Sequence, residues 1–267
     1  LDPEESDARK YLFEIYQKQR NQDRAAEAAR ELIRRQSDQT AYYTFLFDYL
    51  TEKKDFAGLA QEAQDWVRAH PWETKYKEYL ALAYVKLGRL EEAVKVYVDI
   101  CRADPNQAEA WQYLFDLSQA AKKPDQAAKA ARELIRLKPE VLDYYAYVFE
   151  RQVEKKDFQA LAEEAEKWVR ARPDVLKFKE YLAFAYLQQG KLAEAAKVYD
   201  EVSRQKPKDV DLMMKVATLF ENAGLADQAL EVYARILEVE PNNQKAAEAR
   251  LRLTLQRLKK RQTSQAD

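Results

Sequence analysis

The sequence has few of the residues on which most catalytic and metal sites are built. Its 267 residues include one histidine, His70, and one cysteine, Cys101. A single cysteine excludes an internal disulfide, and these two residues together cannot supply the ligands of a zinc site. With only 4 glycines in the chain, no phosphate-binding loop, dinucleotide fingerprint or nucleophile elbow is present. We therefore expect no enzymatic activity, no metal and no cofactor.

Glycine and proline are too scarce for a fold with many tight turns. Only 4 Gly and 8 Pro occur, which favours an all-α fold. The 45 Lys and Arg nearly balance the 46 Asp and Glu, so the overall charge gives no attraction to nucleic acid. No apolar run approaches the length of a membrane span. We expect a soluble protein, cytoplasmic or periplasmic, with no nucleic-acid partner and no membrane insertion.

The prolines that are present follow a fixed step. Seven of the eight lie on a register of 34 residues, and Ser37 takes the one missing place. Proline stops a helix because it lacks the backbone N–H and disfavours helix in the residue before it. Between the prolines, apolar residues recur at helical spacing, as in Leu90, Ala93, Val94 and Tyr97. Each step is therefore predicted to hold two helices. The series consists of Pro3, Pro71, Pro105, Pro139, Pro173, Pro207 and Pro241.

The register divides most of the chain into seven hairpin units of two helices each. One hairpin cannot bury its apolar face, so the units are expected to stack into an array. Residues 1–5 are expected to be the end of a further unit upstream, 244–260 a capping helix and 261–267 a tail. The units are 6–39, 40–73, 74–107, 108–141, 142–175, 176–209 and 210–243.

A block of three units occurs twice. From Ala28 to Tyr97, 39 of 70 residues are identical to the residue 102 positions further on, and the stretch that begins at Trp66 returns at Trp168. Such identity within one chain indicates a recent duplication or an engineered repeat protein, and both origins stay open.

The units resemble the tetratricopeptide repeat (TPR) family in period and motif. The third unit has Leu80, Tyr84, Gly88, Ala93 and Tyr97 where that family expects leucine, tyrosine, glycine, alanine and an aromatic residue. The resemblance implies an all-α, right-handed superhelical α-solenoid of helix-turn-helix repeats, whose first helices line a concave groove. It also implies a non-enzymatic role in protein–protein interaction.

Four units depart from the family pattern in two ways. A phenylalanine replaces the small residue that lets the two helices approach closely, and a charged residue replaces the turn glycine. We expect wider hairpins in these units, which are the first, second, fourth and fifth. The residues are Phe13, Phe47, Phe115 and Phe149, then Arg20, Lys54, Lys122 and Lys156.

The resemblance places two sets of residues near the concave groove. Aromatic residues recur at a step of 34, and they either stack on a ligand or pack between neighbouring first helices. Carboxylates outnumber basic residues at the other groove positions, so a basic peptide or protein segment is the expected partner. The ligand-groove candidates are Tyr79, Tyr113, Tyr147, Tyr181, Asp48, Glu52, Asp116, Glu150, Glu154 and Glu180.

The two ends of the array are expected to differ. Tyr11 and Ile15 would face outward where an upstream unit belongs, so self-association through the N-terminal end is expected. At the other end, the last helix is expected to cover the stack, with its basic residues outside. The expected inner stripe of that helix is Ala247, Leu251, Thr254, Leu255 and Leu258.

These patterns favour a scaffold that binds a basic peptide or protein segment along an acidic concave groove. Stacked hairpins hold such a groove in shape before binding, which lowers the ordering cost of association. Two other functions stay open, an assembly module of a larger complex and a polysaccharide-handling module in which the tyrosines stack on sugar rings.

Overall fold

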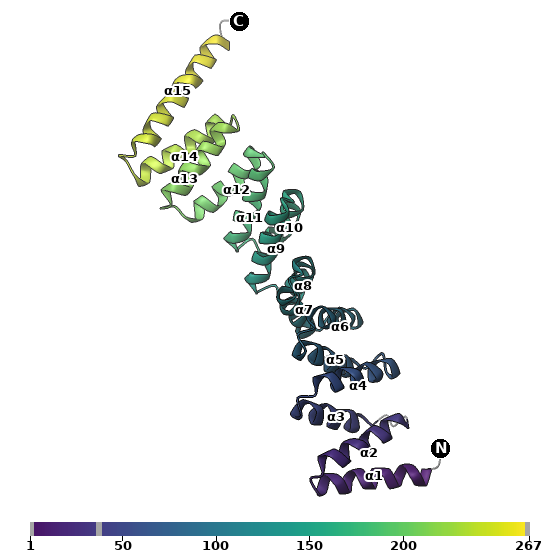
Figure 1. Ribbon diagram of the computed structural model, residues 1–267. Coiled ribbons are helices and arrows are strands. Elements are labelled where there is room, and N and C mark those ends of the chain that lie inside the picture. The colour runs from purple at the N-terminus through teal and green to yellow at the C-terminus, as the bar shows by residue number, and fades with distance from the viewer. Residues whose placement is uncertain (1–2, 36–38, 265–267) are drawn as a thin grey trace. The chain divides into compact units, whose positions relative to one another are not determined.

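The computed structural model describes residues 3–35 and 39–264, and within them it contains fifteen α-helices and no strand (Figure 1). The predicted all-α class is confirmed. From α1 to α8 and from α10 to α15 each helix packs against the next one in chain order, as in an α-solenoid. The helices are α1 Pro3–Lys18, α2 Gln22–Arg34, α3 Thr40–Glu52, α4 Phe56–Ala69, α5 Thr74–Lys86, α6 Leu90–Ala103, α7 Ala108–Ala120, α8 Pro124–Leu137, α9 Leu142–Lys155, α10 Phe158–Ala171, α11 Leu176–Gln188, α12 Leu192–Gln205, α13 Val210–Asn222, α14 Ala226–Val239 and α15 Gln244–Ser264.

The chain forms two compact units, Leu1–Tyr147 and Val148–Asp267. The predicted hairpin units from 40–73 to 210–243 each hold two helices, whereas the boundary predicted at Ser6 falls inside α1. Residues 1 and 2 of the expected upstream unit, and 36–38 of the first hairpin, lie outside the described residues. At the C-terminus, α15 continues to Ser264 rather than ending at 260.

The turn inside each hairpin has a left-handed residue whether or not that residue is glycine. Gly88, Gly190 and Gly224 have φ of 72–74°, and the charged residues at the same position have φ of 54–57°. A side chain in this region costs energy because its Cβ approaches the following carbonyl. The charged residues are Arg20, Lys54, Lys122 and Lys156.

The expectation of wider hairpins is wrong for the first and fourth units. Helices α1 and α2, and α7 and α8, pack as extensively as the glycine-containing pair α5 and α6. The second helix supplies the small residues instead. The buried positions of α2 and α8 are alanine except for Leu32 and Leu134, which leaves room for Phe13 and Phe115.

The two helices of the second hairpin, residues 40–73, are the ones that pack loosely. Helices α3 and α4 pack against each other less extensively than the other hairpins of the first compact unit. In α4 the buried residues are Leu59, Ala60, Ala63 and Trp66. Leu59 occupies the repeat position of Ala127 in α8, and Trp66 occupies that of Leu134. Two bulky side chains therefore add to Phe47, and the hairpin opens. For the fifth unit the wider hairpin stays a prediction.

The inner face of α15 differs from the expected stripe. Ala246 and Leu253 are buried, whereas Leu251, Leu255 and Leu258 are 50–62% exposed. Ala247 and Thr254 are exposed as well. The orientation that buries Ala246 and Leu253 also places Arg252 at 2.7 Å from Glu221 of α13 and Arg257 at 2.9 Å from Asp227 of α14. The leucines consequently face solvent.

None of the helices in the described part of the chain combines the length and the apolar character that crossing a bilayer requires.

Candidate functional site

The tyrosine series does not form a ladder of exposed rings. Tyr79 stacks on Phe47 and Tyr181 stacks on Phe149, each with ring centroids 4.0 Å apart. Tyr79 is 7% exposed and Tyr181 is 8% exposed. Packing between neighbouring first helices therefore takes up both rings, which is the alternative role considered for the series. A peptide or a sugar cannot stack on them in this structure.

The phenylalanines that replace small residues explain which tyrosines are covered. Phe115 of α7 meets the ring of Tyr147 of α9 edge-on at 5.0 Å, just as the other two cover the tyrosine one unit further on. Tyr113 follows a unit with Ala81 at this position, so no first-helix ring covers it. It is 57% exposed. One of its faces stacks on Tyr97 of α6 at 5.4 Å, and the rest is open.

The carboxylates of the first compact unit are available to a partner. Asp48 and Glu52 of α3 and Asp116 of α7 are exposed, and within the described side chains none of them has an ion pair. Asp116 accepts a hydrogen bond from the side-chain amide of Gln112 at 3.1 Å. Glu78 of α5 is half-buried, and burial raises the pKa of its carboxyl above the usual value.

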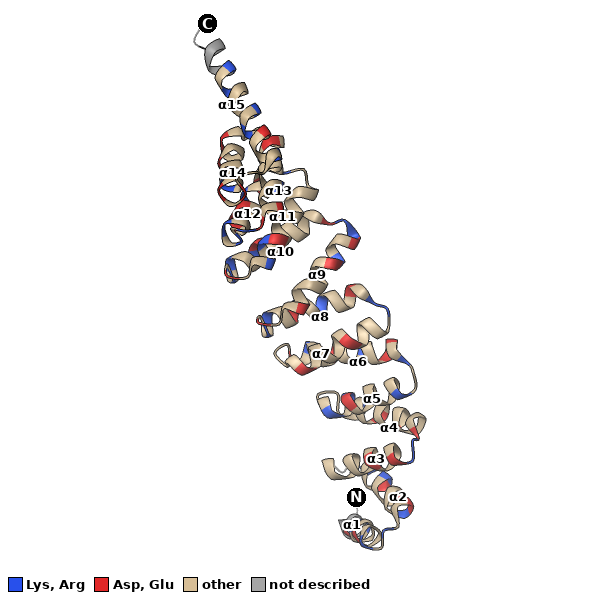
Figure 2. Cartoon of the chain, turned by 90° about the vertical axis from the view of Figure 1, so that its left-hand side faces the viewer, with Lys and Arg blue, Asp and Glu red and all other residues tan. Residues whose placement is uncertain are grey.

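The carboxylates of the second compact unit are more often paired. Glu150 of α9 is exposed, but Glu154 accepts from Arg151 at 2.8 Å. Glu180 of α11 contacts Lys206 at 2.9 Å and Lys177 at 3.3 Å. Burial alone would raise the pKa of Glu180, and the two lysines outweigh that effect and hold its pKa below the usual value. Both signs of charge occur on the helices of this unit (Figure 2).

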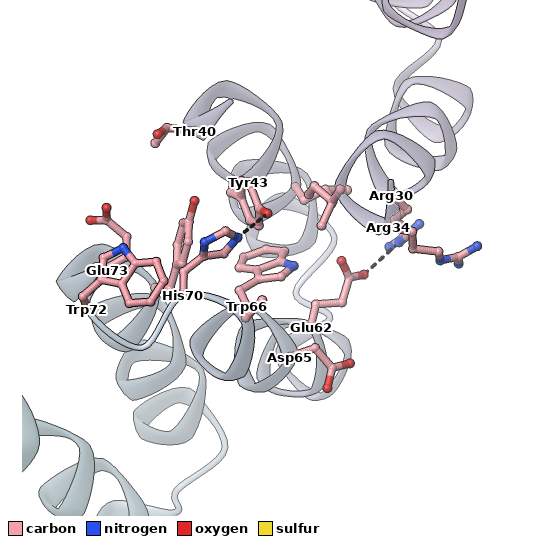
Figure 3. A pocket seen from close by; sticks show the side chains of 14 residues that line it. Arg30, Arg34, Thr40, Tyr43, Glu62, Asp65, Trp66, His70, Trp72 and Glu73 are labelled. Atoms are coloured by element: carbon pink, nitrogen blue, oxygen red, sulfur yellow. Dashed lines mark hydrogen bonds and ion pairs between the residues drawn. The ribbon is translucent and has the colours of Figure 1, made fainter. Parts of the chain in front are cut away.

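The sequence analysis missed a cleft of about 1060 Å³ between α2 and α4. Arg30 and Arg34 line one wall, Glu62 and Asp65 line the other, and Figure 3 shows these four side chains at one end. Trp72, which is 76% exposed, lies at the opposite end beside His70. The sequence around Pro71 could have indicated this cleft, because the two copies of the block differ there: His70, Trp72 and Glu73 have no counterpart in the second copy.

Three models of the tetratricopeptide repeat family match the sequence, over residues 74–117, 153–210 and 186–253. The chain belongs to the tetratricopeptide repeat family. Its hairpins, turns and proline register are thus those of TPR units. No curated protein sequence matches this TPR chain.

Several solved structures are similar to this chain at low sequence identity. A chain of the complex described as Naa15/Naa10 bound to HypK-THB has a TM-score of 0.51 and 18% identity, covering 82% of this chain and 34% of that chain. A TPR protein from Parabacteroides merdae has a TM-score of 0.43 at 13% identity, covering 94% of this chain and 98% of its own. YrrB, a TPR protein with an unusual peptide-binding site, has a TM-score of 0.41 at 15% identity, covering 71% and 98%. This TPR chain thus spans about a third of the first of these proteins, and that likeness concerns the fold.

Proposed function

We propose that this TPR protein is a non-enzymatic scaffold that binds a basic peptide or protein segment along the face of its first helices. Exposed carboxylates without ion pairs carry the proposal, namely Asp48, Glu52 and Asp116 in the first compact unit. They lie on α3 and α7, on the same helices whose buried faces hold the array together.

The exposed ring of Tyr113 adds an apolar contact next to these charges. It lies on α7 one turn before Asp116, and its open face can pack on the hydrocarbon part of a lysine or arginine. A carboxylate that already has a cation gains little from a second one. Glu154 and Glu180 are therefore weaker candidates than Asp48 and Asp116.

The test is binding of a fluorescent lysine-rich peptide to the full chain, followed by anisotropy at several salt concentrations. Exposed ion pairs each contribute up to about 1 kcal/mol. Asp48→Asn with Glu52→Gln and Asp116→Asn is therefore expected to weaken binding by about 10-fold, which is about 1.4 kcal/mol. The affinity of the parent should fall as salt rises.

A control triple variant makes the same charge change on second helices, with Asp99→Asn, Glu163→Gln and Glu238→Gln, all exposed in the structure. It should leave binding nearly unchanged. Equal losses in the two triple variants would show that only net charge matters and would contradict a site on the first helices. For the second compact unit, the double variant Glu150→Lys with Glu154→Lys is tested. If its affinity for the peptide is unchanged, the second compact unit is not part of the binding site.

Assembly is a second candidate function, which we propose because the first and the last described helix expose apolar side chains. Tyr11 is 67% exposed and Ile15 is 44% exposed on α1, while Leu251, Leu255 and Leu258 form an open stripe on α15. Arginines flank that stripe, so two copies of α15 would repel each other. A head-to-tail contact, in which α1 of one copy meets α15 of the next, avoids this repulsion.

A further inference from the structure

The cleft between α2 and α4 exists because the hairpin α3–α4 is loose. Tyr43 and Leu46 of α3 line its inner part, and Tyr76 of α5 lines one end together with His70, Trp72 and Glu73 of the preceding loop. Among the described side chains, the ion pair from Arg30 of α2 to Glu62 of α4 at 2.8 Å crosses it (Figure 3).

Packed aromatic rings form the inner part of the cleft. Tyr43 is 1% exposed and Tyr76 is 3% exposed, and the two rings stack at 4.5 Å. The Tyr43 hydroxyl is 3.1 Å from Nε2 of His70, and the His70 ring stands edge-on to Tyr43 at 5.8 Å. Because these contacts fix His70, the loop that carries it is fixed too.

Trp72 differs from the other rings because it extends out of this cluster. Its ring meets His70 at 6.1 Å, almost perpendicular, and 76% of the residue is exposed. Exposed tryptophan on an ordered loop is a frequent centre of binding energy in protein interfaces. An indole face attracts a cation more strongly than any other aromatic side chain does.

A carboxylate without an ion pair stands next to this ring. Glu73 caps α5 at its N-terminus without a side-chain hydrogen bond to the helix, and no cation pairs with it among the described side chains. The other charges of the cleft are satisfied, because Arg34 pairs with Glu31 at 2.5 Å and Asp65 with Arg68 at 3.1 Å. The unbalanced charge at the Trp72 end is thus negative.

The second copy of the block shows which of these residues the fold requires. At the positions 102 further on, the inner part and the wall keep Tyr145, Trp168 and the aromatic Phe178. The loop does not, because His70, Trp72 and Glu73 are replaced there by arginine, aspartate and valine. The same TPR turn therefore forms without an aromatic and acidic loop, and the turn itself does not require Trp72 and Glu73 in the first copy.

We propose that the Trp72 end of the cleft is a second binding site, distinct from the first-helix face, which takes an arginine or lysine side chain of a protein partner. The cation lies over the Trp72 ring and its head contacts the Glu73 carboxylate. The site takes one cationic side chain, because the carboxylates at the opposite end, Glu62 and Asp65, are already paired with arginines.

The experiment uses the full chain and a short peptide with a single arginine, together with the same peptide carrying uncharged citrulline. Binding is measured by calorimetry, which serves the parent and every variant alike. The arginine peptide should bind and the citrulline peptide should not. Trp72→Leu and Glu73→Gln should each weaken binding by about 3- to 10-fold, the range expected for one cation–π contact or one ion pair.

The loop of the second copy supplies a control for folding. His70→Arg with Trp72→Asp and Glu73→Val gives the first loop residues that this same turn already accommodates, so the variant should fold and lose the arginine peptide. Unchanged affinity in this variant, or equal binding of both peptides, would overturn the proposal. Loss of binding in the Asp48, Glu52 and Asp116 triple variant with no loss in the loop variant would assign the peptide to the first-helix face instead.

Discussion

At the scale of the residue, the hairpin turns show how the chain tolerates a side chain where glycine suits the backbone. In the fourth unit α7 ends at Ala120, and Lys122 follows with φ of 54°. Its backbone N–H donates to the Gln119 carbonyl at 3.0 Å, and that of Lys123 donates to Ser118 at 2.8 Å. These bonds satisfy carbonyls at the helix end, and they hold Lys122 in a conformation that glycine adopts more easily.

Lys122→Gly is therefore expected to stabilise the protein by about 0.5–1 kcal/mol. Relief of the left-handed strain is worth about 1–2 kcal/mol, and the greater freedom of glycine in the unfolded chain offsets part of it. The free energy of unfolding is measured by denaturant titration. Gly88→Lys is the reverse control, because a Cβ added at Gly88 meets no atom within 4 Å and only the conformational strain changes. A loss of stability on Lys122→Gly would contradict the argument.

At the scale of the element, the packing of a hairpin depends on the sum of two helices rather than on one position. Helix α8 has Ala127, Ala128, Ala130 and Ala131 buried. These small side chains leave space for the large Phe115 of α7. Helix α4 has Leu59 and Trp66 buried, and the pair α3–α4 opens instead. The same phenylalanine thus gives a close hairpin in one unit and a cleft in another.

Ala127→Leu tests this account, because it places in α8 the residue that α4 has at the equivalent position. Ala127 is fully buried, and added methyl groups in a filled core cost about 1–3 kcal/mol. Thermal and denaturant unfolding should both show the loss. Lys129→Leu on the exposed side of the same helix is the control and should change stability little. An Ala127→Leu protein as stable as the parent would show that α7 and α8 are not closely packed.

At the scale of the whole molecule, the first and the last described helix expose apolar side chains that no other described helix covers. They are Tyr11 and Ile15 on α1 and Leu251, Leu255 and Leu258 on α15. Each fully buried side chain of this size contributes about 1.5–3 kcal/mol. A contact of a few such residues is expected to give weak, concentration-dependent association.

Sedimentation velocity at rising protein concentration should detect this association. Tyr11→Glu with Ile15→Glu disables one face, and Leu251→Glu with Leu255→Glu disables the other. Each variant should be monomeric by itself, and their mixture should form dimers and nothing larger, since one intact face of each kind remains. A Leu251→Glu and Leu255→Glu protein that still dimerises would show instead that α1 pairs with α1. A monomeric parent would rule out both contacts.

The sequence by itself determined the helices, the 34-residue period and the TPR family, because each depends on local signals. Proline ends a helix wherever it stands, and the apolar spacing identifies a helix before any neighbour is known. The positions of Tyr113 and Asp116 within their unit followed from the same register.

Only the tertiary structure decided which side chains are covered, because burial depends on the residue one unit away. Tyr79 and Tyr113 occupy the same repeat position, yet Phe47 of the preceding first helix covers the first, and no first-helix ring covers the second. The orientation of α15 follows from the core in which Ala246 and Leu253 pack with residues of α13 and α14. The cleft beside Trp72 likewise arises from how far α4 stands from α3, a separation that the combined bulk of both helices sets.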